Sequence, residues 1–237
     1  MLSARDLRRD LTTGRTTTTV LHGCDLELQG GGLTAVVGHS GSGKTSLLMC
    51  LSGLDQPTSG IVMINGRDVY RQSAGRRASM LRSEIGFVFQ QYNLVPFLTV
   101  EENITLPFRL DHAAVPRELV RDLIESFGLG HRRRAPARSL SGGEQQRTAL
   151  CRALARRPGI VFADEPTGAL DSQSTQIVLG ALRRMADEGQ MIVMVTHDLD
   201  AAALADTVVI MHDGRTVSYL GRSTSQELLD VMTELKA

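Results

Sequence analysis

The stretch Thr34–Ser46, TAVVGHSGSGKTS, constrains the fold of this chain more than any other segment. An apolar run, Leu33–Val37, leads directly into Gly38–Thr45, which matches the pattern G-x-x-x-x-G-K-[ST] at every fixed position. Glycines let the backbone turn tightly and point successive N–H groups into one concavity at the start of a helix. The stretch therefore predicts a strand, an anion-binding P-loop and a helix at Lys44–Ser52.

Two side chains of the P-loop fit a triphosphate with its Mg²⁺. Lys44 would reach the β- and γ-phosphates as a point charge, and the hydroxyl of Thr45 would ligate the metal. The alternative is a glycine-rich turn without a ligand, and the match of every motif position and of both flanking elements argues against it. The predicted phosphate-binding residues are Gly38, His39, Ser40, Gly41, Ser42, Gly43, Lys44, Thr45 and Ser46.

Composition sets limits on partners and location. With 237 residues, 42% of them apolar, the chain can form one large α/β domain or two small ones. Basic and acidic residues balance at 26 each and are spread out, so no nucleic-acid partner is expected. Cys24, Cys50 and Cys151 lack metal-ligand spacing and indicate buried thiols in a reducing cytosol. No apolar run approaches the ~20 residues that cross a bilayer, and Met1–Arg5 lacks a signal-peptide core, so membrane contact would require a partner.

Hydrophobic periodicity predicts an α/β fold with a mainly parallel central sheet and an antiparallel β-layer over residues 1–33, interrupted by a turn-rich run at Thr12–Thr19. The almost wholly apolar segment Met191–Val195 is typical of a central parallel strand. Further strands are expected at Ile61–Ile64, Arg67–Tyr70 after the turn Asn65-Gly66, Ile85–Phe89, Ile160–Ala163, Thr207–Met211 and Thr216–Leu220. Further helices are expected at Ala74–Arg82, Val100–Leu106, Arg117–Phe127, about 142–156, Ser172–Glu188, Ala201–Ala205 and Gln226–Leu235, with prolines ending several of them. We expect one domain, 1–237, with a helical subdomain inserted at about 92–157.

Two acidic residues follow the strand Ile160–Ala163. Asp164 is placed as a Mg²⁺ ligand beside a P-loop, and Glu165 could orient or deprotonate a water aimed at the γ-phosphate. Two exposed acids at a strand end would be the simpler interpretation if the P-loop were absent.

The segment Leu140–Arg147, LSGGEQQR, resembles the signature motif of ATP-binding cassette (ABC) ATPases, which other P-loop enzymes do not carry. Further family elements follow in family order: Gln90 resembles the Q-loop glutamine, Ala169-Leu170-Asp171 the D-loop, and His197 the switch histidine. The resemblance spans nearly the whole chain. It implies a P-loop NTPase core with an inserted helical signature subdomain, and ATP with Mg²⁺ as ligands.

The resemblance also implies roles for these residues. Glu165, His197 and Gln90 would be catalytic, and Mg²⁺ would be held by Thr45, Gln90 and Asp164. Ser141, Gly142, Gly143 and Asp171 would contact ATP held by the P-loop of a second subunit, so the sites would form only in a head-to-tail dimer. Ser141–Gly143 open a helix, whose free N–H groups suit an anion.

Two local features refine the resemblance. Asp164–Asp171 and Phe87–Pro96 look most like the branch that includes the lipoprotein-release, macrolide-export and cell-division ATPases. The family usually stacks adenine on an aromatic residue of the N-terminal layer, whereas this chain has Leu11 there and no aromatic residue before Tyr70. The loss of stacking, ~1 kcal/mol, puts selectivity for ATP over GTP in question.

The sequence therefore predicts the ATP-hydrolysing subunit of an ABC transporter, acting as a homodimer or with a paired ATPase subunit. It would drive a separate transmembrane permease at the cytoplasmic face of the membrane, in export or membrane extraction. Three alternatives stay open: signalling to a membrane partner without transport, as in cell division; an amino-acid-type importer subunit; and a non-transport ABC ATPase acting on DNA or ribosomes. The last usually carries coiled-coil insertions, zinc motifs or a second cassette, which are absent from this sequence. Substrate, direction and permease are not encoded in these motifs.

Overall fold

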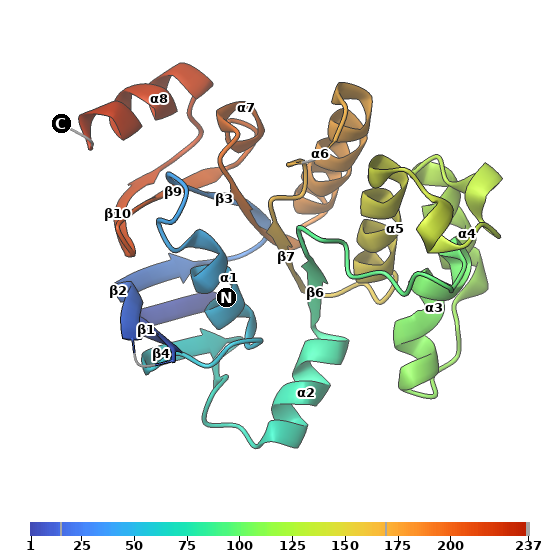
Figure 1. The fold of residues 1–237 in the computed structure, drawn as a ribbon, viewed down its shortest axis with the longest axis horizontal. Coiled ribbons are helices and arrows are strands. Elements are labelled where there is room, and N and C mark those ends of the chain that lie inside the picture. The colour runs from blue at the N-terminus through green and yellow to red at the C-terminus, as the bar shows by residue number, and fades with distance from the viewer. Residues whose placement is uncertain (15, 169, 236–237) are drawn as a thin grey trace.

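The computed structural model describes residues 1–14, 16–168 and 170–235. Two β-sheets enclose helix α1 (Lys44–Ser52), which contacts strands of both, and most other helices cover the larger sheet (Figure 1). In order across the larger sheet lie β10 (Arg215–Leu220), β9 (Thr207–His212), β3 (Gly32–Val37), β8 (Met191–Thr196), β7 (Ile160–Asp164) and β6 (Ile85–Val88). Only β10 of these is antiparallel to its neighbour, so the predicted parallel sheet is confirmed, with β8 at its centre.

Strict alternation of side chains divides the interior into two hydrophobic cores. On β8, Ile192 and Met194 join the core under the outer helices, whereas Val193 and Val195 face the core around α1. Because both faces of the sheet are covered, every residue of β8 is buried, and the strand is a continuous apolar run in the sequence.

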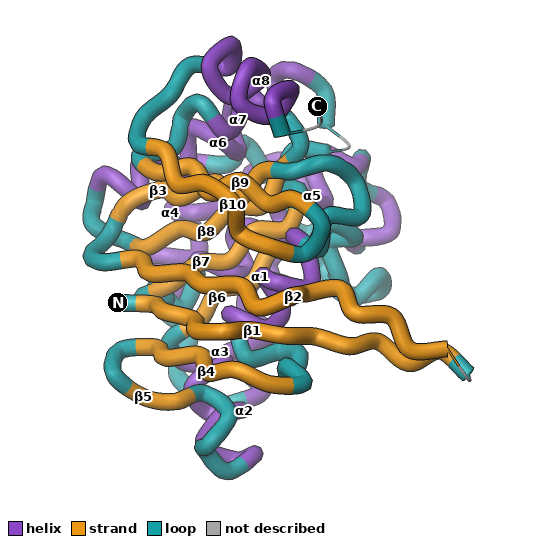
Figure 2. Tube along the Cα trace, turned by 90° about the vertical axis from the view of Figure 1, so that its left-hand side faces the viewer, coloured by secondary structure: helices purple, strands orange, loops and turns teal. Residues whose placement is uncertain are grey.

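The smaller sheet is antiparallel, with the order β2 (Thr16–Leu28), β1 (Leu2–Thr13), β4 (Ser59–Ile64) and β5 (Arg67–Asp68). Figure 2 shows the hairpin of β1 and β2 extending far beyond the rest of the molecule. The predicted turn-rich run at Thr12–Thr19 was wrong, because Thr12 pairs with Thr17 and Thr13 with Thr16 within the hairpin. Threonine is β-branched and favours strands, so the turn shrinks to the residues around Gly14, and Arg15 lies outside the described residues.

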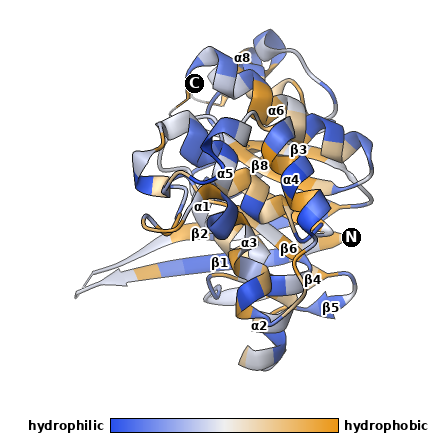
Figure 3. Cartoon of the chain, turned by 90° about the vertical axis from the view of Figure 1, so that its right-hand side faces the viewer, coloured by the Kyte–Doolittle hydropathy of each residue, from blue (hydrophilic) through white to orange (hydrophobic). Residues whose placement is uncertain are grey.

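The helices that follow β6 form a group beside the larger sheet: α3 (Val100–Leu110), α4 (Arg117–Ser126) and α5 (Gly142–Leu154), with the short 3-10 turns Gly130–Arg132 and Ala137–Ser139. In Figure 3 their hydrophilic surfaces face outward, over hydrophobic strands such as β8. The remaining helices are α2 (Ala74–Ser83), α6 (Ser172–Asp187), α7 (Leu199–Ala202) and α8 (Ser225–Glu234). None of the helices in the described ranges is long and apolar enough to cross a membrane.

Two predicted boundaries shift for identifiable reasons. Helix α3 continues past Pro107, where the sequence predicted its end, and buries Phe108 in the core of the helical group. The return strand after Asn65-Gly66 ends at Asp68 rather than Tyr70, since the Asp68 carboxylate accepts from the Tyr70 backbone N–H in a tight turn. The predicted hairpin turn itself is confirmed: both of its residues have positive φ, 49° and 76°.

Candidate active site

A pocket of about 640 Å³ opens at the carboxyl ends of the parallel strands, a volume within the range of roughly 300–1,000 Å³ that small-molecule sites occupy. The P-loop connects β3 to α1, Glu165 follows β7, His197 follows β8, and Gln90 follows β6. The fold thus brings together segments that are far apart in sequence. The lining residues are Val20, Ser40, Gly41, Gly43, Lys44, Thr45, Ser46, Gln90, Glu165 and His197.

The ammonium group of Lys44 is held over the P-loop. Its Nζ donates to the carbonyl oxygens of Gly38 and His39, each at 2.9 Å. Burial lowers the pKa of Lys44, and the carboxylates of Glu165 and Asp164 oppose that shift. Among the described residues, no carboxylate forms an ion pair with Lys44. This buried ammonium group is therefore suited to a polyphosphate, whose negative charge would favour the protonated form of Lys44.

The P-loop follows its tight path because side chains are excluded at two glycines. Gly43 has φ 94°, and a Cβ there would lie 2.6 Å from the carbonyl oxygen of Val20. A Cβ on Gly38 would lie 2.4 Å from the carbonyl oxygen of Met211. The loop is therefore packed directly against strands β2 and β9, which fixes its shape before any ligand binds.

Thr45 lines the pocket, and Asp164, which does not line it, lies within hydrogen-bond distance of the Thr45 hydroxyl. The Thr45 hydroxyl donates to Oδ1 of Asp164 at 2.9 Å. Burial raises the pKa of Asp164, while the hydrogen bond from Thr45 opposes the shift. A hydroxyl and a buried carboxylate are the hard oxygen ligands that Mg²⁺ prefers, so the residues present fit that ion. Gln90 lines the same pocket, as predicted for the third ligand; the three metal roles stay predictions.

Glu165 and His197 form a pair across the pocket. Nδ1 of His197 lies 2.9 Å from Oε1 of Glu165, whereas Oε2 of Glu165 is buried and has no hydrogen-bond partner among the described residues. Glu165 has φ 45°, and its backbone N–H donates to the carbonyl oxygen of Val195 at the end of β8. A non-glycine residue in this conformation is strained, and such strain gathers at functional sites. One oxygen of the Glu165 carboxylate is therefore paired with His197, and the other has no partner in the part of the chain that the structure describes.

The signature segment lies outside this pocket. Ser141 is the N-cap of α5, where its hydroxyl accepts from the Glu144 N–H and the Glu144 carboxylate accepts from the Ser141 N–H. The first N–H groups of a helix have no partner within it, so those of Gly142 and Gly143 are available to an anion. A Cβ on Gly143 would lie 2.5 Å from Oγ of Ser174, which explains why glycine is required there.

Asp171, the last residue of the predicted D-loop, caps α6. Its carboxylate accepts from the backbone N–H of Ser174 at 2.8 Å and from the Ser174 hydroxyl at 2.9 Å, and these bonds lower its pKa. Ala169 of the same predicted loop lies outside the described residues. None of Ser141, Gly142, Gly143 and Asp171 lines the pocket of its own chain.

Leu11, the predicted adenine-contacting residue, also stands apart from the pocket. It pairs with Thr18 on the projecting hairpin and is 40% exposed. Val20, on the same hairpin, lines the pocket instead, and sequence reasoning did not single it out because no motif marks it. Gly38, His39 and Ser42 belong to the P-loop without lining the pocket. The Ser42 hydroxyl is buried and has no hydrogen-bond partner within the described part of the chain, and His39 turns toward strand β9.

This combination of P-loop, paired carboxylates, histidine and signature segment defines a P-loop ATPase of the cassette type. The family model "ABC transporter" matches residues 21–168. The lipoprotein-releasing system ATP-binding protein LolD of Shewanella frigidimarina is 41% identical over 217 residues, covering 90% of this chain and 91% of LolD. The chain therefore belongs to the ABC transporter family and is one of its ATPase cassettes, as the sequence motifs indicated.

Two further comparisons agree. The macrolide export ATP-binding/permease protein MacB 1/2 of Paracoccus denitrificans is 42% identical over 220 residues, which cover 92% of this chain. The dimeric ATP-binding cassette MJ0796, solved in a post-hydrolysis state with ADP and Pi, superposes with a TM-score of 0.88 at 31% identity, covering 94% of this chain and 99% of that chain. The fold class is thereby confirmed. The chain spans 33% of the length of the MacB relative and 50% of the length of another curated relative that it matches.

Proposed function

We propose that this cassette hydrolyses Mg²⁺-ATP to ADP and phosphate and drives a separate membrane permease in export or membrane extraction. One observation carries the proposal: a single pocket is lined by a buried lysine on a P-loop, by Thr45, whose hydroxyl donates to Asp164, and by Glu165, whose carboxylate pairs with His197. The dimeric cassette with ADP and Pi and the names of the LolD and MacB relatives support it.

In the proposed reaction each residue has a separate task. Lys44 and the P-loop N–H groups hold the β- and γ-phosphates, while Thr45, Asp164 and Gln90 would hold Mg²⁺, which supplies charge neutralisation on those phosphates. The Glu165 carboxylate accepts a proton from water, whose oxygen forms a bond to the γ-phosphorus. The bond from that phosphorus to the bridging oxygen breaks, and ADP leaves with the electron pair.

His197 has a positioning task with respect to Glu165 and a direct one with respect to phosphate. Its Nδ1 faces Glu165 Oε1, so Nε2 of the doubly protonated ring would be the group that donates to a γ-phosphate oxygen. The His197 side chain is 68% exposed, which leaves it accessible from the open side of the pocket. It can therefore respond to whether a triphosphate or a diphosphate is present.

We further propose that the site is completed by a second cassette arranged head to tail. Ser141 caps α5, whose first residues are Gly142 and Gly143, and Asp171 caps α6. None of these four residues lines the pocket of its own chain. In this arrangement the segment 92–157 acts as a signature subdomain within a single domain, 1–237. The partner would be an identical chain or a paired ATPase subunit.

The proposed permease would dock beside the Q-loop, which places this chain at the cytoplasmic face of the membrane. Phe97 is 75% exposed there, with Arg138 stacked over its ring, and Val95 is 37% exposed. These apolar side chains suit a short amphipathic segment of a membrane protein. No nucleic-acid partner is proposed, because the 26 basic residues are balanced by 26 acidic ones.

Phosphate release from Mg²⁺-ATP by the purified chain tests the enzymatic part. We expect Lys44→Ala to abolish nucleotide binding and phosphate release, whereas Lys236→Ala, which removes the only other lysine of the chain, leaves both unchanged. Equal phosphate release by wild type and Lys44→Ala would contradict the proposed site. Affinity purification from native membranes tests the transport part. We expect a membrane protein with several transmembrane helices to co-purify in stoichiometric amount. A membrane partner that lacks the transmembrane helices of a transporter would favour the signalling alternative.

A further inference from the structure

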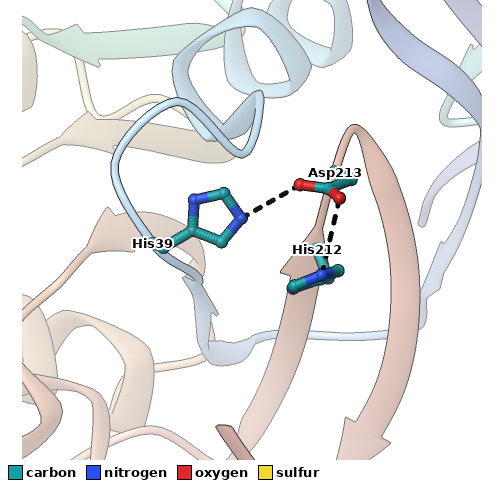
Figure 4. Close-up of side chains that lie close together, drawn as sticks. All are labelled: His39, His212 and Asp213. Carbon is teal, nitrogen blue, oxygen red and sulfur yellow. Dashed lines mark ion pairs between the residues drawn. The ribbon is translucent and has the colours of Figure 1, made fainter. Parts of the chain in front are cut away.

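A second cluster of ligand-type side chains includes a P-loop residue, and none of its members lines the ATP pocket. It consists of His39 in the P-loop and His212 and Asp213 at the end of β9, and one ligand atom from each lies within 4.8 Å of the others. Figure 4 shows both imidazole rings directed at the Asp213 carboxylate, which projects from the turn between β9 and β10. The exposed fractions of the two histidines are 35% and 31%, so an ion from solvent can reach them.

Hydrogen bonding determines which nitrogen of His39 faces the carboxylate. Nδ1 lies 2.8 Å from the carbonyl oxygen of Ser40, and a carbonyl can only accept, so Nδ1 carries the proton. In a neutral ring Nε2 then presents a lone pair, and it lies 3.2 Å from Oδ1 of Asp213. Two acceptors face each other and require a positive group between them, either a proton or a metal ion. An imidazole whose other nitrogen donates to a carbonyl is the common arrangement for a metal-bound histidine.

His212 adds a second nitrogen to the same carboxylate. Its Nε2 lies 3.5 Å from Oδ2 of Asp213. Ligand atoms around a tetrahedral Zn²⁺ are about 3.3 Å apart, because each lies about 2.0–2.2 Å from the metal. The two nitrogen–oxygen distances are close to that spacing but involve different oxygens of Asp213, and one ligand atom from each of the three residues lies within 4.8 Å of the others.

The backbone holds the cluster in place. The Gly214 N–H donates to the Ser42 carbonyl oxygen at 3.1 Å, and the His22 N–H donates to the Gly214 carbonyl oxygen at 2.8 Å. Asp213 and Gly214 both have positive φ, 43° and 71°, as a tight two-residue turn requires. The P-loop and the turn are thus joined by main-chain contacts that do not depend on the three side chains.

We propose that His39 Nε2, His212 Nε2 and a carboxylate oxygen of Asp213 form a site for one transition-metal ion of the Zn²⁺ type, with water as the fourth ligand. Two imidazoles and one carboxylate suit a borderline-soft ion better than Mg²⁺ or Ca²⁺. The ion would connect the P-loop to the β9–β10 turn through His39, whose backbone carbonyl oxygen also accepts from Lys44 Nζ. The site is distinct from the Mg²⁺ site at Thr45 and Asp164.

The first test is metal binding by the chelator-treated, nucleotide-free chain. Nucleotide is left out because a triphosphate itself chelates Zn²⁺. We expect one Co²⁺ per chain, with the visible d–d absorption of a four-coordinate site, displaced by one Zn²⁺. The His197→Ala variant tests whether the metal binds instead between His197 and Glu165. Its Co²⁺ affinity and stoichiometry should equal those of wild type. Absence of a Co²⁺ or Zn²⁺ complex would mean that the cluster is held by a proton only, which overturns the proposal.

The second test assigns the ligands. His212→Asn and Asp213→Asn should each lower Zn²⁺ affinity by at least about tenfold. His131→Asn is the matched control, because His131 also lies beside a single carboxylate, that of Glu144, outside the cluster. Its Zn²⁺ affinity should equal that of wild type. Unchanged affinity in both cluster variants would overturn the assignment.

A measurement on the wild type guards against variants that fail to fold. Zn²⁺ should shift the ring-proton NMR signals of His39 and His212 and leave those of His22, His112 and His131 in place. Zn²⁺ should also raise Tm in wild type, since a ligand that binds only the folded state stabilises it. Shifts at any other histidine, with none at His39 and His212, would place the metal elsewhere and refute the site.

Discussion

Nδ1 of His197 lies 2.9 Å from Oε1 of Glu165, although the histidine follows strand β8 and the glutamate follows strand β7. The two strands are neighbours in the parallel sheet, so their carboxyl ends deliver both side chains to one pocket. The pairing uses one carboxylate oxygen and leaves Oε2 buried, with no hydrogen-bond partner among residues 1–14, 16–168 and 170–235. An unpaired carboxylate oxygen beside a P-loop is what a general base requires.

Replacing Glu165 with Gln removes the proposed base and keeps the side chain's shape. We expect Mg²⁺-ATP binding to persist, phosphate release to fall by about 10²–10⁴-fold, and an ATP-bound dimer to accumulate. Light scattering with and without Mg²⁺-ATP, and a phosphate-release assay, measure the two effects. Glu188→Gln, at an exposed glutamate that ends α6, is the control and should behave as wild type. Wild-type turnover in Glu165→Gln would exclude Glu165 as the base.

Asp206 forms hydrogen bonds with the start of β3 and with two arginines. Its carboxylate accepts from the Leu33 backbone N–H at 2.9 Å and from Arg183 and Arg222. Burial alone would raise its pKa, but the three donors outweigh burial and lower the pKa to about 2. A depressed pKa means that the ionised form stabilises the folded state. That contribution is complete above the unfolded pKa of about 3.9 and is lost as the pH falls through about 2.

We therefore expect Asp206→Asn to reduce the free energy of unfolding at pH 7 by about 1 to 2 kcal/mol, the lower range for hydrogen bonds to charged groups, because the side chain is 31% exposed. The difference from wild type should shrink as the pH is lowered below about 4. Urea denaturation at several pH values measures both. Asp187→Asn, which removes a more exposed partner of Arg183, should cost about 0.5 kcal/mol or less. A difference that grows toward low pH would contradict the assignment.

Much of the fold could be predicted because local signals and long-range packing agree. The P-loop pattern places a strand, turn and helix with α1 bounded correctly at Lys44 and Ser52, and the buried run at β8 predicts its central position. Gln90, Glu165 and His197 were predicted as one site from a family order of motifs, and parallel strands bring all three to one pocket. Their catalytic roles remain predictions.

The sequence could not indicate features set by contacts between distant segments. Val20 reaches the pocket because the hairpin of β1 and β2 crosses beside Gly43, and no local pattern encodes that approach. The pairing of His39 with Asp213 depends on the same kind of contact, between the P-loop and the β9–β10 turn. The run Thr12–Thr19 contains Gly14 and polar side chains, and the prediction gave these more weight than the strand preference of threonine, so the extent of the hairpin was underestimated.

Leu11 provides a test of nucleotide selectivity. It occupies the position where the family usually has an aromatic residue, but lies on the projecting hairpin and does not line the pocket of the single chain. We expect weak preference for ATP over GTP in wild type. Leu11→Tyr should tighten ATP binding about fivefold if the ring stacks on adenine, which corresponds to ~1 kcal/mol. Leu11→Met controls for bulk without an aromatic face. Strong ATP preference in wild type with no gain in Leu11→Tyr would assign base recognition to another residue.

The last prediction concerns the composite site, in which Lys44 of one subunit and Ser141 of the other must meet around one triphosphate. Lys44→Ala removes the cation that contacts phosphate, and Ser141→Arg blocks the signature face by its bulk. A chain with Lys44→Ala paired with a chain with Ser141→Arg places both lesions in one site and leaves the second intact. A doubly substituted chain paired with wild type instead damages each of the two sites once.

Head-to-tail sites therefore predict one occluded ATP per dimer in the first pairing and none in the second. Sites built within single chains predict the reverse, because the wild-type subunit of the second pairing would keep its own site. Differently tagged subunits, purified as heterodimers in the Glu165→Gln background to stop turnover, allow bound nucleotide to be counted. Counting nucleotide is preferable to measuring turnover, since hydrolysis could require both coupled sites. Equal occupancy in the two heterodimers would refute the shared site, and with it the proposal that Ser141 and Asp171 act on the partner's ATP.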